Sequence, residues 1–121
     1  MKMCLKQIEG RTGEELASKY LESLGYKIIC NNFRCTQGEI DVIAQDRDEL
    51  VFIEVKTRSS IKFGEAKEAV NQRKQKHIVN AAKYYLYKTR QEGVNIRIDV
   101  MEVYLFGKKV KINHIKQAVW A

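Results

Sequence analysis

The sequence of 121 residues contains no proline, only two histidines and only three cysteines, Cys4, Cys30 and Cys35. The cysteine number is odd, and the N-terminus lacks the apolar core of roughly 7–15 residues found in a secretory signal, so a disulfide-stabilised secreted domain is not indicated. We therefore expect a protein of the reducing cytoplasm. Cys30 and Cys35 could join His77 and His114 around zinc, but the spacing of these four residues does not match that of known zinc motifs.

Long hydrophobic runs are also missing from the sequence. No apolar stretch approaches the ~20 residues that a membrane-spanning helix needs, so we expect no membrane association. The apolar fraction of 45% over 121 residues is nevertheless sufficient for a core without disulfides or a structural metal. We therefore expect one domain, residues 1–121.

Positive charge is abundant. The chain has 22 Lys and Arg against 15 Asp and Glu, a formal net charge of +7. This balance favours a polyanionic partner such as nucleic acid. A protein-interaction domain in which the charge only aids solubility would have the same composition, so charge alone leaves both interpretations open.

The pattern of apolar residues predicts two helices and five strands. Residues 13–24 have helical spacing with Gly25 as a natural stop, and residues 26–33 form a strand that we expect Asn31-Asn32 to end. The remaining elements are a hairpin of strands 39–45 and 50–57, a helix over 66–91 ended by Gly93, and a second hairpin of strands 96–106 and 110–112. The order α-β-β-β-α-β-β predicts an α/β (α+β) fold with a central mixed β-sheet flanked by helices.

The first hairpin brings charged side chains together. Alternation along a strand places Glu54 and Lys56 on one face, and it likewise gives Glu39 and Asp41 a common face. Pairing of the two strands could bring Asp41 near Glu54. Two such carboxylates repel each other unless a cation lies between them, and oxygen ligands select Mg²⁺ or Mn²⁺.

This arrangement has a chemical interpretation. A divalent ion held by Asp41 and Glu54 can polarise a phosphate and activate water, and Lys56 could stabilise charge that develops in the transition state. Glu14 lies three and seven residues before Ala17 and Leu21, so it could face the sheet and complete the metal site. In the alternative interpretation, Glu54 and Lys56 form an ordinary surface ion pair and Glu14 complements the helix dipole.

A set of short motifs, taken together, resembles the YraN-like family of small bacterial proteins. They are Gly10-Arg11-Thr12-Gly13-Glu14, Gly25-Tyr26, Asn32-Phe33-Arg34, Gly38-Glu39-Ile40-Asp41, Phe52-Ile53-Glu54-Val55-Lys56-Thr57-Arg58, Phe63-Gly64, Glu68-Ala69-Val70, Lys74, Ala81-Ala82, Tyr85-Leu86, Arg97-Ile98-Asp99-Val100 and His114-Ile115-Lys116. That family is similar to the archaeal Holliday-junction resolvases of the PD-(D/E)xK superfamily, which have a restriction-endonuclease-like core.

The resemblance implies a metal site with Glu14 as the helix glutamate, Asp41 as the motif aspartate, and Glu54 with Lys56 as the (D/E)xK pair. It implies Mg²⁺ or Mn²⁺ as cofactor and a homodimer. The chain departs from the pattern at two prolines, one replaced by Ala66 and the namesake proline by Ile40. Lys74 lies on the inward stripe of the second helix, where a lysine needs a partner, so we include it in the site.

The sequence therefore leads to two competing functions. The first is an endonuclease that hydrolyses phosphodiester bonds in DNA, with branched DNA as a candidate substrate and RNA as the less favoured alternative. The second is a nucleic-acid-binding module that keeps the nuclease fold without turnover. In either case we expect Glu39 to support the site and basic residues to contact phosphates, namely Arg34, Arg58, Arg73, Lys76 and Arg97.

Overall fold

The computed structural model describes residues 5–58 and 72–119, which form two helices and five strands. The predicted α+β fold and element order are confirmed. The elements are α1 (Leu5–Ser23), β1 (Lys27–Cys35), β2 (Gly38–Asp46), β3 (Glu49–Arg58), α3 (Gln72–Lys88), β4 (Asn95–Phe106) and β5 (Lys109–Val119). The predicted connection after β3 and the predicted helix start at Ala66 lie outside the described residues.

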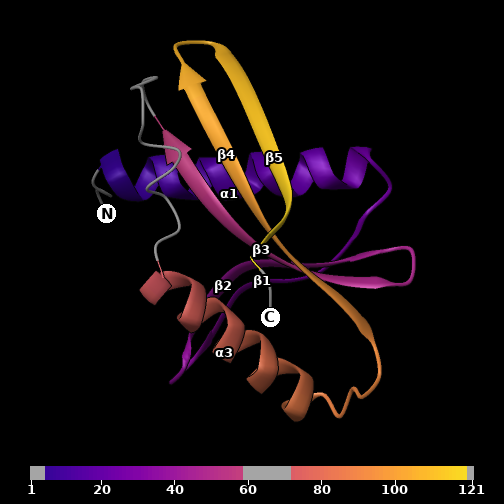
Figure 1. Ribbon diagram of the computed structural model, residues 1–121. Helices are drawn as coiled ribbons and strands as arrows, with labels where there is room; N and C mark the ends of the chain where they lie inside the picture. Colours follow the sequence, from indigo (N-terminus) through magenta and orange to yellow (C-terminus); the bar gives the residue numbers. More distant parts are fainter. Residues whose placement is uncertain (1–4, 59–71, 120–121) are drawn as a thin grey trace.

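One mixed sheet forms the centre of the fold. Its strand order is β1-β2-β3-β4-β5, and all neighbours are antiparallel except β3 and β4, which are parallel. A parallel pair needs a crossover, and α3 lies in that crossover. Figure 1 shows α1 and α3 on opposite faces of the sheet.

Each helix covers its own hydrophobic core, because strand side chains alternate between the two faces. On one face, Ala17 and Leu21 of α1 pack with Val51 and Ile53 of β3. On the other face, the buried residues of α3 pack with those of β2, β3 and β4: Ile78, Ala81, Ala82, Tyr85, Ile40, Ile43, Leu50, Phe52 and Ile98. The chain therefore needs the sheet to be apolar on both sides.

The end of α1 follows the prediction. Gly25 has a φ of 95°, which a residue with a side chain rarely adopts. The Tyr26 amide donates to the Leu21 carbonyl at 3.0 Å across this turn, as in a Schellman motif. The start of α1 at Leu5 is eight residues before the predicted start at Gly13.

Two predicted strand ends were wrong. Asn31-Asn32 does not end β1, which continues to Cys35 because Asn32 takes a φ of 55° and pairing with β2 resumes at Phe33. The last strand does not stop at Ile112 but continues to Val119. The backbone of β5 pairs with β4 as far as Val119. The prediction stopped too early because β5 is an edge strand, and its exposed polar residues hide the strand alternation.

Among the described residues, no helix is both long and apolar enough to cross a membrane.

Candidate functional site

The sheet divides between β2 and β3, and the predicted site lies at this division. Pairing of β2 with β3 runs from Asp46–Glu49 to Val42–Ile53. Beyond that point β3 stays paired with β4 as far as Arg58–Tyr104, while β2 stays paired with β1 as far as Gly38–Cys35. Figure 1 shows the two strands separating. Backbone groups at the start of the division have lost their ladder partners and need others.

Asp41 supplies one of those partners. Its Oδ2 atom accepts a hydrogen bond from the Val55 amide at 2.7 Å, which holds the carboxylate between the separating strands. Burial and the negative charge of Glu54 together raise the pKa of Asp41 to about 7, although the Val55 hydrogen bond opposes the shift. Asp41 therefore lies close enough to Glu54, as predicted, for the two carboxylates to repel each other.

Glu54 is the point where two lysines converge. Lys56 Nζ lies 3.0 Å from Glu54 Oε1, and Lys74 Nζ of α3 lies 3.8 Å from the same oxygen. Lys56 and Glu54 are mostly buried, with side chains 16% and 13% exposed, whereas Lys74 is 46% exposed. The expected juxtaposition of Glu54 with Lys56 is present, whereas Lys74, expected on the inward stripe, is exposed and reaches Glu54 with its ammonium group.

The two lysines differ in their affinity for a proton. Burial lowers the pKa of Lys56, but hydrogen bonds with Lys74 and Glu54 and the charge of Glu54 outweigh it, so the net shift is upward. The hydrogen bond with Lys56, burial and the charge of Lys56 lower the pKa of Lys74. The two ammonium groups therefore share Glu54, and their mutual interaction shifts the two pKa values in opposite directions.

Glu14 approaches from α1, as the sequence predicted. Burial raises the pKa of Glu14, while hydrogen bonds with the Asn32 and Asp41 side chains oppose this shift. The contact with Asp41 brings α1, β2 and β3 together at the division of the sheet. Asn32 contributes from the left-handed position in β1 described above.

Two glycines allow the helices to come this close to the sheet. A Cβ atom at Gly13 would overlap Thr57 Oγ1 of β3, and one at Gly38 would lie 2.9 Å from the His77 carbonyl oxygen of α3. Any side chain at either position would push a helix away from the sheet. Gly13 directly precedes Glu14, and His77 lies one helical turn after Lys74, so these contacts set the positions of both site residues.

The carboxylates are neighbours rather than a preformed three-ligand cluster. In the described part of the chain, no group of three or more His, Cys, Asp and Glu side chains is arranged to hold a metal ion. Asp41 contacts Glu14 and interacts electrostatically with Glu54, so it links the two. A cation would find two acceptors at Asp41 and Glu54, with Glu14 beside the first.

Of the predicted supporting residues, Arg34, Glu39 and Lys74 line an open pocket. Arg34 and Glu39 form an exposed ion pair at 3.4 Å, and Glu39 adds its charge to those that raise the pKa of Asp41. A pocket of about 410 Å³ opens beside Glu54 and is lined by Arg34, Cys35, Gly38, Glu39, Glu54, Lys74, His77 and Ile78. Arg73 and Lys76 are exposed on α3, and Arg58 is half-buried at the end of β3.

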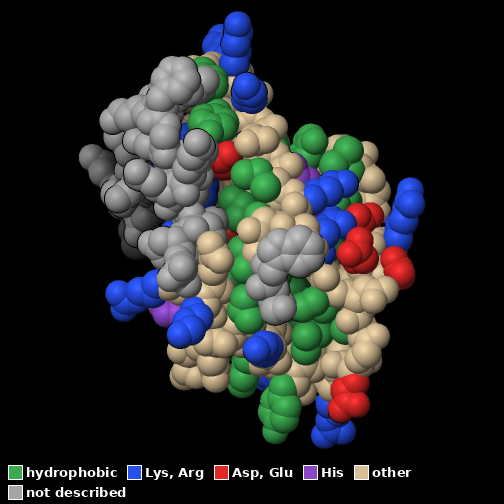
Figure 2. Space-filling view, in the orientation of Figure 1, with side chains coloured by type: hydrophobic (Ala, Val, Ile, Leu, Met, Phe, Trp, Pro, Cys, Tyr) green, Lys and Arg blue, Asp and Glu red, His purple; other side chains and the backbone are tan. Residues whose placement is uncertain are grey.

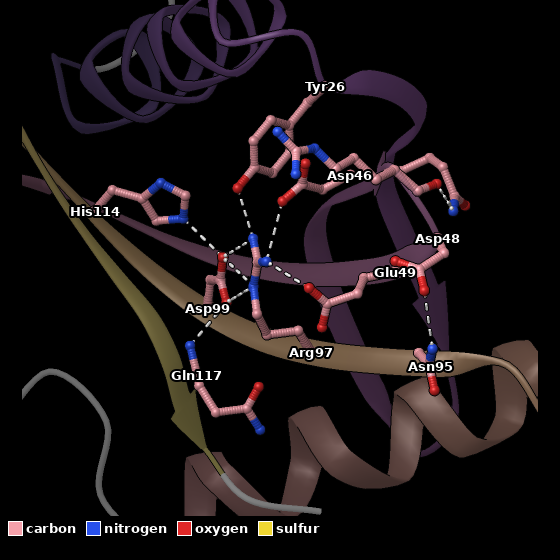
Figure 3. Close-up of polar contacts among 11 residues, drawn as sticks. Tyr26, Asp46, Asp48, Glu49, Asn95, Arg97, Asp99, His114 and Gln117 are labelled. Atoms are coloured by element: carbon pink, nitrogen blue, oxygen red, sulfur yellow. Dashed lines mark hydrogen bonds and ion pairs between the residues drawn. The ribbon is translucent and has the colours of Figure 1, made fainter.

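The expectation that Arg97 contacts phosphate is wrong. Arg97 is 7% exposed, at the opposite end of β4 from the candidate site. Its Nε atom donates to Asp99 at 2.9 Å, and its other nitrogens donate to Asp46, Glu49 and Tyr26 (Figure 3). Strand alternation places Asp99 on the same face as Arg97, but it gave no sign of the other three acceptors, because these come from other segments of the chain.

The same network contains an aspartate–histidine pair that sequence reasoning did not identify. His114 Nε2 of β5 lies 2.7 Å from Asp99 Oδ2, and the Gln117 amide donates to Asp99 Oδ1 at 3.0 Å (Figure 3). Burial raises the pKa of Asp99, but the hydrogen bonds from His114 and Arg97 outweigh it and the net shift is downward. The network fastens β5 to β4 where their register shifts, which indicates a structural role.

Asn32, Gly13 and Gly38 are the site-positioning residues that sequence reasoning did not assign. For Asn32 the sequence offered an Asn pair, which is equally typical of a strand end, and the motif Asn32-Phe33-Arg34, and neither assigned it a role at the site. The roles of Gly13 and Gly38 depend on the approach of a helix from outside their own segments, so local sequence carried no signal for them.

Comparison with known proteins gives one family. The model of "Uncharacterised protein family UPF0102" matches residues 13–103. UPF0102 proteins of Caldicellulosiruptor bescii and Caldanaerobacter subterraneus are 49% and 44% identical to this chain, covering 96% and 98% of it and 99% of each relative. Another, from Clostridioides difficile, is 48% identical and covers 91% of this chain and 95% of its own.

A solved structure is also similar to this chain, at a much lower level. It is that of Pyrococcus furiosus SfsA in complex with Ca²⁺, with 15% identity and a TM-score of 0.40, and the match covers 96% of this chain and 65% of that one.

Proposed function

We propose that this chain, which belongs to the uncharacterised protein family UPF0102 (YraN), is a metal-dependent nuclease acting on DNA. The observation that carries the proposal is the half-buried Asp41 carboxylate, which accepts a hydrogen bond from the Val55 amide at 2.7 Å at the division between β2 and β3. Burial and the charge of Glu54 raise its pKa to about 7. Strongly shifted carboxyl groups in a concave, charged setting are typical of functional sites. The resemblance to the PD-(D/E)xK superfamily points to the same residues.

The donor set fits a hard divalent cation. Asp41 and Glu54 offer oxygen ligands, the type that Mg²⁺ and Mn²⁺ prefer, and their mutual repulsion would be relieved by a positive ion. Glu14, in contact with Asp41, would be the third oxygen donor. When bound, such an ion supplies Lewis-acid polarisation of the scissile phosphate and activation of water.

The other residues of the site have roles that follow from their contacts. The Lys56 ammonium group, held by Glu54 at 3.0 Å and with its pKa raised, can stabilise the negative charge that develops on a phosphate oxygen. Lys74 adds a second positive charge 3.8 Å from the same Glu54 oxygen and lines the pocket. Arg34, at the rim of that pocket, is suited to a neighbouring phosphate of the strand.

DNA is the proposed substrate because the chain carries a net charge of +7 and the pocket lining includes the cationic side chains of Arg34 and Lys74. Arg73 and Lys76 add exposed positive charge on α3, and Arg58 adds a half-buried positive charge at the end of β3. The resolvase resemblance adds two parts to the proposal, a branched DNA substrate and a homodimer. The cysteine content adds a third, location in the cytoplasm.

A second candidate is a DNA-binding module without turnover. It is favoured by the Lys56–Glu54 ion pair and by the lack, within residues 5–58 and 72–119, of a ready group of three metal ligands. In such a module the carboxylates would be structural, and Lys and Arg would supply the affinity.

One experiment separates these candidates. Purified protein is incubated with labelled branched, duplex and single-stranded DNA in Mg²⁺, in Mn²⁺ and in chelator. The nuclease proposal expects metal-dependent cleavage of at least one form that Asp41→Asn abolishes. Binding without cleavage of any form in either metal would leave the binding module, and cleavage retained by Asp41→Asn would indicate a contaminating enzyme.

A further inference from the structure

The hairpin of β4 and β5 continues the face of the sheet that carries Glu54 and Lys56. Residues paired on neighbouring strands share a face, and Lys56 pairs with Glu102 while Arg58 pairs with Tyr104. Phe106 follows Tyr104 on the same face by strand alternation. The candidate site is therefore continuous with an aromatic surface two to four residues further along the strands.

Tyr104 and Phe106 form an ordered pair of rings. Their planes differ by 9°, their centroids are 6.1 Å apart, and both side chains are partly exposed. The Tyr104 hydroxyl donates to Glu102 Oε2 at 3.1 Å, and the side-chain Nδ2 of Asn113 in β5 donates to Glu102 Oε1 at 2.8 Å. Because Glu102 is fully buried and held from two strands, it fixes the direction of the Tyr104 ring.

Basic side chains flank these rings. On β5, Lys111 pairs with Tyr104 and Lys109 pairs with Phe106, so both lysines lie on the aromatic face, and both are exposed. On β3, Arg58 borders Tyr104 from the other side. Lys and Arg side chains gather with hydrophobic ones over the hairpin tip at the top of Figure 2. Parallel aromatic rings between cations are the arrangement that binds unpaired nucleic acid, since bases stack on rings and phosphates contact lysines.

We propose that this surface, the hairpin platform of Tyr104, Phe106, Lys109, Lys111 and Arg58, binds unpaired bases of a nucleic-acid strand beside the candidate site. A blunt duplex keeps its base faces inside the stack and cannot offer them to the rings, whereas a single strand, a flap or a branch can. The inference rests on the proposed nuclease function and deepens it. The substrate class becomes nucleic acid with an unpaired segment next to the cleaved bond.

The test measures binding rather than cleavage. Fluorescence anisotropy of the full chain in chelator is recorded with labelled oligothymidylate and with a blunt duplex of the same length. We expect tighter binding of the single strand. Tyr104→Ala and Phe106→Ala should each weaken that binding roughly tenfold to a hundredfold, the scale of one lost base-stacking partner, and should change duplex binding little.

Two further variants guard against misfolding and against a general aromatic effect. Lys109→Glu with Lys111→Glu alters only exposed side chains, and it should weaken strand binding and reduce its dependence on salt. Tyr87→Ala removes a tyrosine that is 81% exposed on α3, away from the platform, and should bind like the wild type. Thermal melting of each variant verifies that it is folded.

The outcomes are separable from those of the nuclease proposal. Equal affinity of the wild type for strand and duplex, or wild-type affinity in folded Tyr104→Ala and Phe106→Ala, would overturn the platform. Selective strand binding with no cleavage in any metal would keep the platform and remove the nuclease. Cleavage of duplex and single strand at equal rates by both the wild type and Tyr104→Ala would keep the nuclease and remove the platform.

Discussion

At the scale of single residues, Asp41 has the most unusual chemistry. Its pKa of about 7 lies far above the ordinary 3.8, and burial and the charge of Glu54 are the causes. Between these two values the folded protein holds a proton at Asp41 that the unfolded chain has released. The free energy of unfolding must then fall as the pH rises through this interval, because ionisation is more costly in the folded state.

Asp41→Asn should remove this pH dependence. The amide oxygen can still accept from the Val55 amide, but it has no charge to repel Glu54. In chelator, the variant should gain stability relative to the wild type as the pH rises from about 4 to about 8. Urea unfolding at a series of pH values measures the difference, and a constant difference across the series would contradict the shifted pKa.

Lys56→Ala should separate rate from affinity. Loss of an electrostatic stabiliser costs about a hundred- to a thousandfold in rate, whereas loss of one phosphate contact among many costs about 1 kcal/mol or less in binding. Cleavage kinetics and anisotropy on the same DNA give both quantities. The matched control is Arg73→Ala on the exposed face of α3, which should lower affinity and its salt dependence while leaving the rate at saturation near that of the wild type. Equal losses in both quantities for Lys56→Ala would argue for a binding role.

At the scale of elements, α1 and α3 approach the divided sheet from opposite sides and meet it at glycines. The contacts of Gly13 with Thr57 and of Gly38 with His77 leave no room for a side chain. Glycine inside a helix normally destabilises it by about 1 kcal/mol relative to alanine. Gly13 in α1 is therefore kept for close approach, and that approach determines where Glu14 lies.

Gly13→Ala should destabilise the protein despite the better helix propensity of alanine. Overpacking against Thr57 should lower the free energy of unfolding by about 1–3 kcal/mol, and Gly13→Ala with Thr57→Ala should recover part of the loss, because Thr57 Oγ1 is the overlapped atom. Urea denaturation measures both. Glu15→Ala, at an exposed position two residues after Gly13, should change the free energy of unfolding little. A more stable Gly13→Ala protein would show that α1 can move without cost.

At the scale of the whole molecule, one end of the sheet is closed and the other is open. At the closed end, Arg97 links Asp46, Glu49 and Asp99 from three strands. At the open end, β2 and β3 separate and like charges collect around Asp41. At the closed end each of the three carboxylates accepts a hydrogen bond from Arg97, whereas at the open end the charges of Glu54, Glu14 and Glu39 all raise the pKa of Asp41, so a cation beside Asp41 would relieve repulsion.

Mg²⁺ or Mn²⁺ should accordingly raise the melting temperature. Linkage gives about 2.7 kcal/mol of stabilisation at a metal concentration a hundred times Kd, enough for a shift of several degrees in a chain of this size. Differential scanning fluorimetry with increasing metal measures the shift. It should vanish in Asp41→Asn and persist in Glu22→Gln, a change at an exposed carboxylate on α1. A wild-type melting temperature that does not respond to millimolar metal would count against the cation site.

The sequence by itself determined the order of the elements and the juxtaposition of Glu54 with Lys56. Apolar periodicity predicted the α-β-β-β-α-β-β order, and alternation put Glu54 beside Lys56, because these are local properties of helices and strands. Tertiary structure alone decided the division between β2 and β3, the burial of Arg97 and the roles of Gly13 and Gly38. The physical reason is that each of these features depends on groups brought together from distant segments. A glycine is required only where another element comes close, and the pKa of Asp41 is likewise shifted only by burial and by neighbours from other segments.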